Sequence, residues 1–243
     1  MIMSEQMRVW VEVIFNITYL VVVWTLVILM IVRRNRVDPE NRALANRFTW
    51  AFALLALGDT GHVGFRVIAY LQGGLELNPV LVGAGAFSTA FTVTIFYILM
   101  VDIWRLRFRK SYGFLGWFLL AAGAVRLIIL LFPQNAWGQV VAPYDWSLLR
   151  NSLLVIQGVG VTFLILRDAI REHDRAFTWI GIMIVLSFTF YAPVILWVQL
   201  VPLLGMLMIP KTCAYLVVAF IAYFELFYPK KSNPLISVDK IIE

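Results

Sequence analysis

Seven long apolar stretches fill most of the sequence, and they restrict what the chain can fold into. Each is close to the ~20 residues that a helix needs to cross the hydrocarbon core of a bilayer. Backbone groups in lipid must be hydrogen-bonded within the protein, and the short alternating segments of a membrane barrel are missing. We therefore predict an all-α, polytopic membrane bundle of seven transmembrane helices. The helices are expected at roughly 10–32, 48–71, 80–104, 113–132, 148–166, 176–200 and 204–228.

The composition agrees with a membrane protein. Hydrophobic residues make up 62% of the 243 positions and charged residues 14%, against about 25% charged residues in a typical soluble domain. The apolar windows and short loops use nearly the whole length. We therefore expect a single transmembrane domain over residues 1–243, within which residues 229–243 form a short cytoplasmic tail.

Cysteine and histidine are too scarce for the usual metal sites. Cys213 is the only cysteine, which excludes an intramolecular disulfide and a cysteine metal cage. His62 and His173 are the only histidines, so a three-histidine zinc site cannot be built. We expect neither a metal nor another cofactor.

The basic residues are sorted into alternate loops. Fifteen of the twenty lysines and arginines lie in the segments 33–47, 105–112 and 167–175 and in the tail. The positive-inside rule makes these segments cytoplasmic, with the N-terminus outside, in a multi-pass plasma (inner) membrane protein. The same sorting accounts for the net charge of +6, so no nucleic-acid partner is expected. Asp102 and Glu225, near this boundary, should pair with loop arginines.

The two halves of the sequence share a pattern. The tripeptide Phe48-Thr49-Trp50 recurs as Phe177-Thr178-Trp179, each time after an apolar window and a charged loop. This favours two parallel three-helix units joined by the fourth helix, a known construction of transporters, with chance similarity as the alternative. Further equivalent pairs are Asn16 and Asn151, Arg33 and Arg167, Thr89 and Thr212, and Asp102 and Glu225.

A second group of polar residues lies within or beside the apolar windows. Asp59, His62 and Arg66 follow an i, i+3, i+7 spacing, which places them on one helical face. Ionisable groups at the bilayer centre cost roughly 2.5–3.5 kcal/mol each, so they pair, line water or bind something. The predicted topology puts ten candidate ligand-binding residues in the outer half: Asp59, His62, Arg66, Arg126, Arg150, Asn151, Gln157, Tyr191, Lys211 and Thr212.

Four cations in this group face one carboxylate. Asp59 can neutralise one of them, and we expect its partner to be Arg66 or Lys211. The excess of positive charge predicts an outward-opening cavity that binds a carboxylate, a phosphate or a lipid headgroup, because arginine recognises such anions by bidentate hydrogen bonds. Alternatively, Arg126 and Arg150 extend to the headgroups of surrounding lipids, and the residues around Asp59 form a buried structural network.

The run Gly58-Asp59-Thr60-Gly61-His62-Val63-Gly64-Phe65-Arg66 resembles a Gly-Asp-x-x-His-x-x-x-Arg signature of seven-helix bacterial membrane proteins without an assigned function. The resemblance extends to Arg126, the segment 133–137, Arg150-Asn151 and Pro210-Lys211-Thr212. It implies the seven-helix fold and no particular activity. The three-plus-one-plus-three layout is also similar to sugar and vitamin permeases and to opsins. The third helix lacks the charged pattern of ion-pumping opsins, so no retinal is expected on Lys211.

Three hypotheses of function remain open. A transporter of a small anionic solute is favoured by the repeat and the cationic residues. A membrane-embedded enzyme acting on a lipid would use Asp59 and His62 as a base and the group that orients it. A seven-helix receptor or sensor would use the same cavity as its ligand site. The expected partners are membrane lipids and the anionic ligand, and the sequence leaves the oligomeric state open.

Overall fold

The computed structural model describes residues 5–139 and 141–228. Within them the protein is helical, and seven helices are long and apolar enough to cross a membrane, as predicted for a multi-pass membrane protein. The tail at 229–243 lies outside the described residues. The helices are α1 (Glu5–Arg33), α2 (Arg42–Leu71), α3 (Pro79–Arg107), α4 (Gly113–Leu130), α5 (Tyr144–Arg171), α6 (Arg175–Trp197) and α7 (Met208–Leu226).

Several helices differ in length from the apolar windows that predicted them. α2 begins at Arg42 rather than at 48, and α5 covers Tyr144–Arg171 rather than 148–166. Charged residues do not interrupt a helix, so these helices extend beyond the apolar windows. α7 begins later than predicted, at Met208, because a six-residue 3₁₀ helix, Pro202–Leu207, precedes it.

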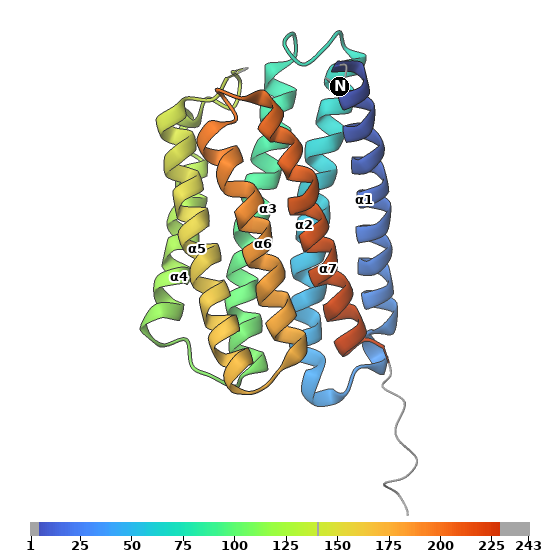
Figure 1. Ribbon diagram of the computed structural model, residues 1–243, viewed down its shortest axis with the longest axis vertical. Helices are drawn as coiled ribbons and strands as arrows, with labels where there is room; N and C mark the ends of the chain where they lie inside the picture. The colour runs from blue at the N-terminus through green and yellow to red at the C-terminus, as the bar shows by residue number, and fades with distance from the viewer. Residues whose placement is uncertain (1–4, 140, 229–243) are drawn as a thin grey trace, which may run out of the picture.

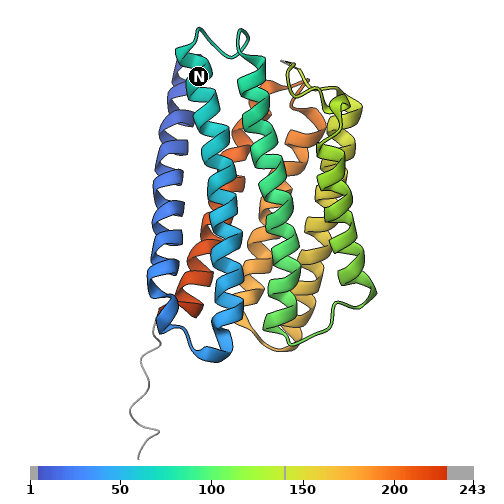
Figure 2. The same ribbon diagram turned by 180° about the vertical axis from the view of Figure 1, so that it is seen from behind.

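The helices form a ring in chain order (Figures 1 and 2). Each packs on the next, and α7 closes the ring against α1 and α2. α3 also packs on α5, and α4 lies beside these two. The contacts of α1 with α2 and of α2 with α3 have counterparts in those of α5 with α6 and of α6 with α7. This arrangement fits two parallel three-helix units related by an axis along the bundle.

The repeated tripeptides share three structural features. Phe48 and Phe177 are buried, and their rings meet edge to face with centroids 6.0 Å apart. The hydroxyl groups of Thr49 and Thr178 each donate to the carbonyl four residues earlier, at 2.9 and 2.8 Å. The tryptophans that follow are both exposed on the outside of the bundle. The two segments therefore pack against each other in equivalent positions.

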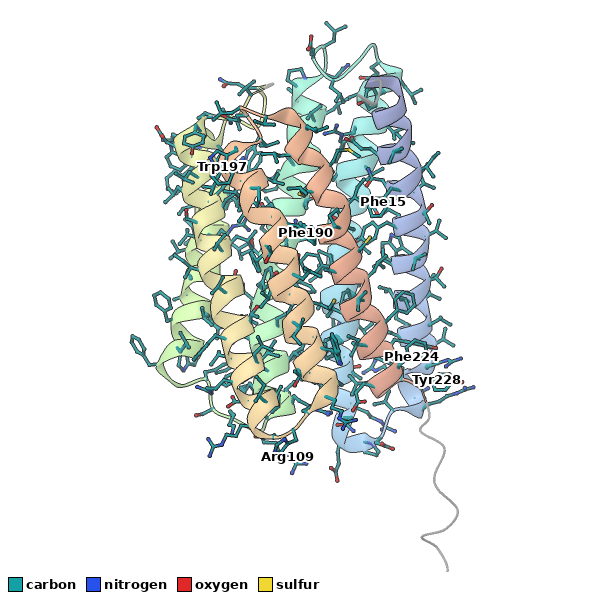
Figure 3. All side chains as sticks on the ribbon, viewed as in Figure 1. Phe15, Arg109, Phe190, Trp197, Phe224 and Tyr228 are labelled. Atoms are coloured by element: carbon teal, nitrogen blue, oxygen red, sulfur yellow. The ribbon has the colours of Figure 1, made fainter. Side chains whose placement is uncertain are left out.

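We call the end where α1 ends and α2 begins the basic end; Arg109 lies there, and Trp197 lies toward the opposite end (Figure 3). The basic loops predicted to share one side of the membrane meet at this end. Asp102 pairs with Arg47 at 2.5 Å and with Arg105 at 2.8 Å, and Glu225 pairs with Arg107 at 3.3 Å. The prediction that both acids pair with arginines at this boundary is confirmed.

The apolar core lies mainly in the half of the bundle next to the basic end. In α2 the buried residues run from Leu44 to Gly58, followed only by Ala69. In α6 they run from Phe177 to Ser187, and the remaining residues toward the N-terminal end are only partly buried or exposed. In these two helices, therefore, fewer residues are buried in the half of the bundle that contains the chain's N-terminus, here called the N-terminal half.

Candidate functional site

Close packing of α2 on α3 positions the Gly58–Arg66 segment. A Cβ atom added at Gly61 would lie 2.6 Å from the hydroxyl oxygen of Ser88, and one added at Gly85 would lie 3.1 Å from Cα of His62. The hydroxyl of Thr89 donates to the carbonyl of Gly58 at 3.2 Å. Because glycines permit this approach, the polar face of α2 has a fixed position in the bundle.

Asp59 is held by a tyrosine of α1. The hydroxyl of Tyr19 donates to Oδ2 of Asp59 at 2.6 Å. The carboxylate is half-buried, and no ion pair within 4.0 Å involves it among the described residues. The expected ion pair of Asp59 with Arg66 or Lys211 is therefore not formed, and the described partner of the carboxylate is a neutral hydroxyl.

Lys211 lies in the first turn of α7 and contacts aromatic rings. Its Nζ is 4.1 Å from the ring centroid of Tyr191 on α6 and 5.9 Å from that of Tyr215 on α7. The hydroxyl of Tyr215 is hydrogen-bonded in turn to Tyr97 on α3. Lys211 is half-buried and makes neither an ion pair nor a hydrogen bond within the described parts of the chain. Cation–π contacts attract an ammonium group but leave its hydrogen-bond donors unused.

Arg126 is buried between three helices. Its exposed fraction is 1%, so the alternative that it extends to lipid headgroups is wrong. Nε donates to the carbonyl of Arg150 on α5 at 2.7 Å, and Nη1 donates to the carbonyl of Ala90 on α3 at 2.8 Å and to the hydroxyl of Thr94. These acceptors are all uncharged. Arg126 thus fixes α4 to α3 and α5, and no acidic side chain among the described residues pairs with it.

Arg150 is held by the loop between α4 and α5. Its guanidinium donates to Oδ1 of Asn135 at 3.1 Å and lies 4.4 Å from the ring centroid of Trp137. Asn135 is itself buried and donates to the carbonyls of Ile129 and Phe132, which fixes the loop on the end of α4. Arg150 is 9% exposed, so it also turns inward rather than toward lipid.

A series of contacts connects the arginines to Lys211. Arg150 and Asn151 both donate to the hydroxyl of Ser147, at 3.5 and 3.4 Å. The hydroxyl of Tyr191 donates to Oδ1 of Asn151 at 3.3 Å, and the ring of Tyr191 makes a cation–π contact with Lys211. We call Arg126, Arg150, Asn151, Tyr191 and Lys211 the cationic cluster.

The other candidates lie around this cluster or apart from it. Nδ1 of His62 is buried and lacks a hydrogen-bond partner, and no hydrogen bond joins His62 to Asp59 in the described chain. Arg66 and Thr212 are half-buried. Gln157 is fully buried, and neither of its amide atoms has a partner. It lies six residues beyond Asn151 on α5, roughly 9 Å deeper at 1.5 Å per residue, and is not part of the cluster.

Sequence reasoning missed three residues that hold the candidates in place: Tyr19, Thr94 and Ser147. Tyr19 has a detectable signal, because it is the only tyrosine of the first apolar window and a phenol in lipid requires a hydrogen-bond partner. Thr94 has none. Its hydroxyl donates to the carbonyl of Ala90 at 2.7 Å, as a threonine in any helix can, and its role as acceptor for Arg126 depends on the fold.

The comparisons with known proteins leave the site to be interpreted on its geometry. No protein-family model, curated protein or solved structure matches this chain. What the fold defines is an all-helical, seven-helix membrane protein.

Proposed function

We propose that the protein binds a small organic anion in its N-terminal half and transports it across the membrane. The observation that carries this proposal is Lys211, a half-buried ammonium group that lies against the rings of Tyr191 and Tyr215 and makes no hydrogen bond or ion pair with the described residues. It lies at one end of the cationic cluster. The cationic cluster contains Arg126, Arg150 and Lys211 and no carboxylate, and the carboxylate of Asp59 is hydrogen-bonded to a tyrosine.

The charges differ in how they are satisfied. Arg126 and Arg150 find neutral acceptors that occupy several of their donors. Lys211 and Arg66, both half-buried, have no hydrogen bond or ion pair among the described residues. An ammonium group with three unused donors in a medium of low dielectric constant binds an anion more strongly than the same group does in water. A carboxylate or phosphate beside Lys211 therefore supplies the acceptor that the protein lacks.

Three features of the bundle favour transport over simple binding. The parallel three-helix units resemble a construction common in transporters. Pro193 interrupts the hydrogen bonds of α6, and the 3₁₀ helix before α7 interrupts the chain again close to Lys211. In α2 and α6 fewer residues are buried in the N-terminal half than in the half at the basic end, where most of the apolar core lies. These features suit a site that opens to one side at a time.

The lipid-enzyme hypothesis receives less support. A general base and its orienting group are normally joined by a hydrogen bond. In the described chain Asp59 accepts from Tyr19 instead, and Nδ1 of His62 has no partner. The residues needed for that mechanism are therefore not arranged for it.

The test compares Lys211→Met with Lys110→Met in liposomes that contain the purified protein. Methionine keeps the length of the side chain and removes the charge, while Lys110 lies at the basic end beside Glu172 at 3.4 Å. The probe is a labelled mixture of small carboxylates and phosphate monoesters. Because a hydrogen bond to a charged group is worth 1.5–3 kcal/mol, we expect Lys211→Met to weaken binding about 10- to 100-fold and to abolish uptake.

The control variant should bind and take up the mixture like the wild type. Equal binding by Lys211→Met and wild type would contradict the anion site. Binding without uptake, in both orientations of the protein, would contradict transport and retain the site.

A further inference from the structure

We infer that the ligand is a small zwitterion whose ammonium group binds Asp59 and whose acidic group binds Lys211. This inference rests on the proposed anion site and adds a second, oppositely charged subsite to it. Its basis is a pair of opposite charges that share one region of the bundle and form no ion pair with any of the described residues.

The first half of the pair is a carboxylate with spare acceptor capacity. An ionised carboxylate offers about four lone-pair sites on two oxygens. The hydroxyl of Tyr19 takes one site, on Oδ2, and no donor contacts Oδ1 within the described residues. A hydrogen bond from a single neutral donor offsets only part of the desolvation cost of a half-buried charge. An ammonium group supplies both the missing hydrogen bonds and the missing charge.

The second half of the pair is Lys211, whose donors are unused. α7 packs on both α1 and α2, and Leu216 of α7 contacts the buried cluster that contains Tyr19 and Ala56. Asp59 follows Ala56 in α2 and Lys211 precedes Leu216 in α7, so both lie on the N-terminal side of this contact. They are nevertheless not within the 4.0 Å of an ion pair.

The aromatic contacts explain why the two charges stay apart. The Tyr191 ring holds the ammonium of Lys211 on the α6 side, and Tyr19 holds the carboxylate of Asp59 on the α1 side. A built-in ion pair would instead close to contact. Two fixed and separated opposite charges complement a molecule that carries an amine and an acid a few bonds apart. The tyrosine rings add cation–π attraction for the amine.

Two sources supply this chemistry: a free α-amino acid, and the headgroup of an aminophospholipid, in which a primary amine and a phosphate are joined by a short linker. Both present an ammonium group to Asp59 and an acidic group to Lys211. Both also require Asp59, which an anion that binds Lys211 alone does not.

The first arm of the test measures the thermal unfolding midpoint of the purified protein with three probes. These are a mixture of free α-amino acids, the same mixture N-acetylated, and the same mixture as methyl esters. Acetylation removes the ammonium charge, and esterification removes the acid. We expect the free amino acids to raise the midpoint at concentrations about 10- to 100-fold lower than either derivative, because each derivative loses one charged hydrogen bond.

Substitutions assign the two ends of the ligand. Asp59→Asn should remove the advantage of the free amino acids over their N-acetyl derivatives. Lys211→Met should remove their advantage over the esters. Glu76→Gln, an exposed carboxylate in the loop between α2 and α3 at the same end of the bundle, is the matched control and should change neither. The comparison of probes on the wild type remains decisive if Asp59→Asn does not fold.

The second arm uses nanodiscs of phosphatidylethanolamine or phosphatidylglycerol. If the headgroup is the source of the zwitterion, phosphatidylethanolamine should raise the unfolding midpoint and phosphatidylglycerol should not. Asp59→Asn should then remove the effect of phosphatidylethanolamine, and free amino acids should leave the midpoint unchanged. If N-acetylated amino acids bind as well as free ones and Asp59→Asn changes nothing, the zwitterion inference is wrong while the anion site stands. If no probe with an acidic group shifts the midpoint in either arm, both are wrong.

Discussion

Arg126→Ala should lower the free energy of unfolding by about 3 kcal/mol or more. The side chain is 1% exposed and donates to two carbonyls and a hydroxyl on α3 and α5. Truncation removes these hydrogen bonds and leaves a cavity where three helices meet. The measurement is denaturant or thermal unfolding of the purified protein in one detergent, with the wild type alongside.

Two further variants separate the causes. Arg126→Met keeps most of the volume and removes the charge, and a well-packed apolar replacement for a buried charge is often tolerated, so its loss should be clearly smaller. Arg109→Ala removes an arginine whose side chain is 85% exposed beside Glu40, and it should stay within about 0.5 kcal/mol of the wild type. An Arg126→Ala variant as stable as Arg109→Ala would contradict the buried position.

Gly83→Ala should destabilise the protein by up to about 3 kcal/mol, the upper part of the range for overpacking. A Cβ atom at this position of α3 would collide with the carbonyl of Trp137. The obstacle is backbone, so it cannot rotate aside as a side chain would. α3 and the loop before α5 must separate, and Trp137 then loses its position 4.4 Å from the guanidinium of Arg150. Ligand binding should weaken together with stability.

Gly64→Ala, the same substitution at another glycine, should change the stability of the protein in the opposite direction. Gly64 lies inside α2, and an added Cβ would meet no atom within 4 Å. Alanine is the better helix former, so the variant should be more stable than the wild type by roughly 0.5–1 kcal/mol. Unfolding midpoints of the two variants in one detergent test both predictions. Equal effects at Gly83 and Gly64 would mean that the loop does not contact α3.

The number of helices was predictable from the sequence because hydropathy reports directly on the solvent that a segment requires. Helix ends were less predictable. Hydropathy detects where the apolar stretch of α5 ends, but the helix itself continues to Arg171. The shared Phe-Thr-Trp segments indicated equivalent positions, yet the contact between Phe48 and Phe177 became evident only with the packing.

The candidate site was predictable in its residues and less so in their partners. Charged side chains in apolar windows are visible in any sequence, so Arg126, Arg150 and Lys211 were found. Two of the acceptors of Arg126 are backbone carbonyls, which every residue has, and no pattern of letters marks the ones that are used. The expected ion pair of Asp59 was wrong for a related reason: its described partner is Tyr19, a neutral group forty residues earlier in the chain that no charge pattern indicates.

The position of α4 affects the direction in which the helices after it cross the bilayer. Three spans carry a polypeptide from one face of a bilayer to the other, so a second copy of a three-helix unit fused directly to the first would be inserted upside down. α4, which packs beside α3 and α5, supplies one additional span before α5 begins. If α1–α3 and α5–α7 are the two proposed units, this span gives both units the same direction, which agrees with the contact between Phe48 and Phe177.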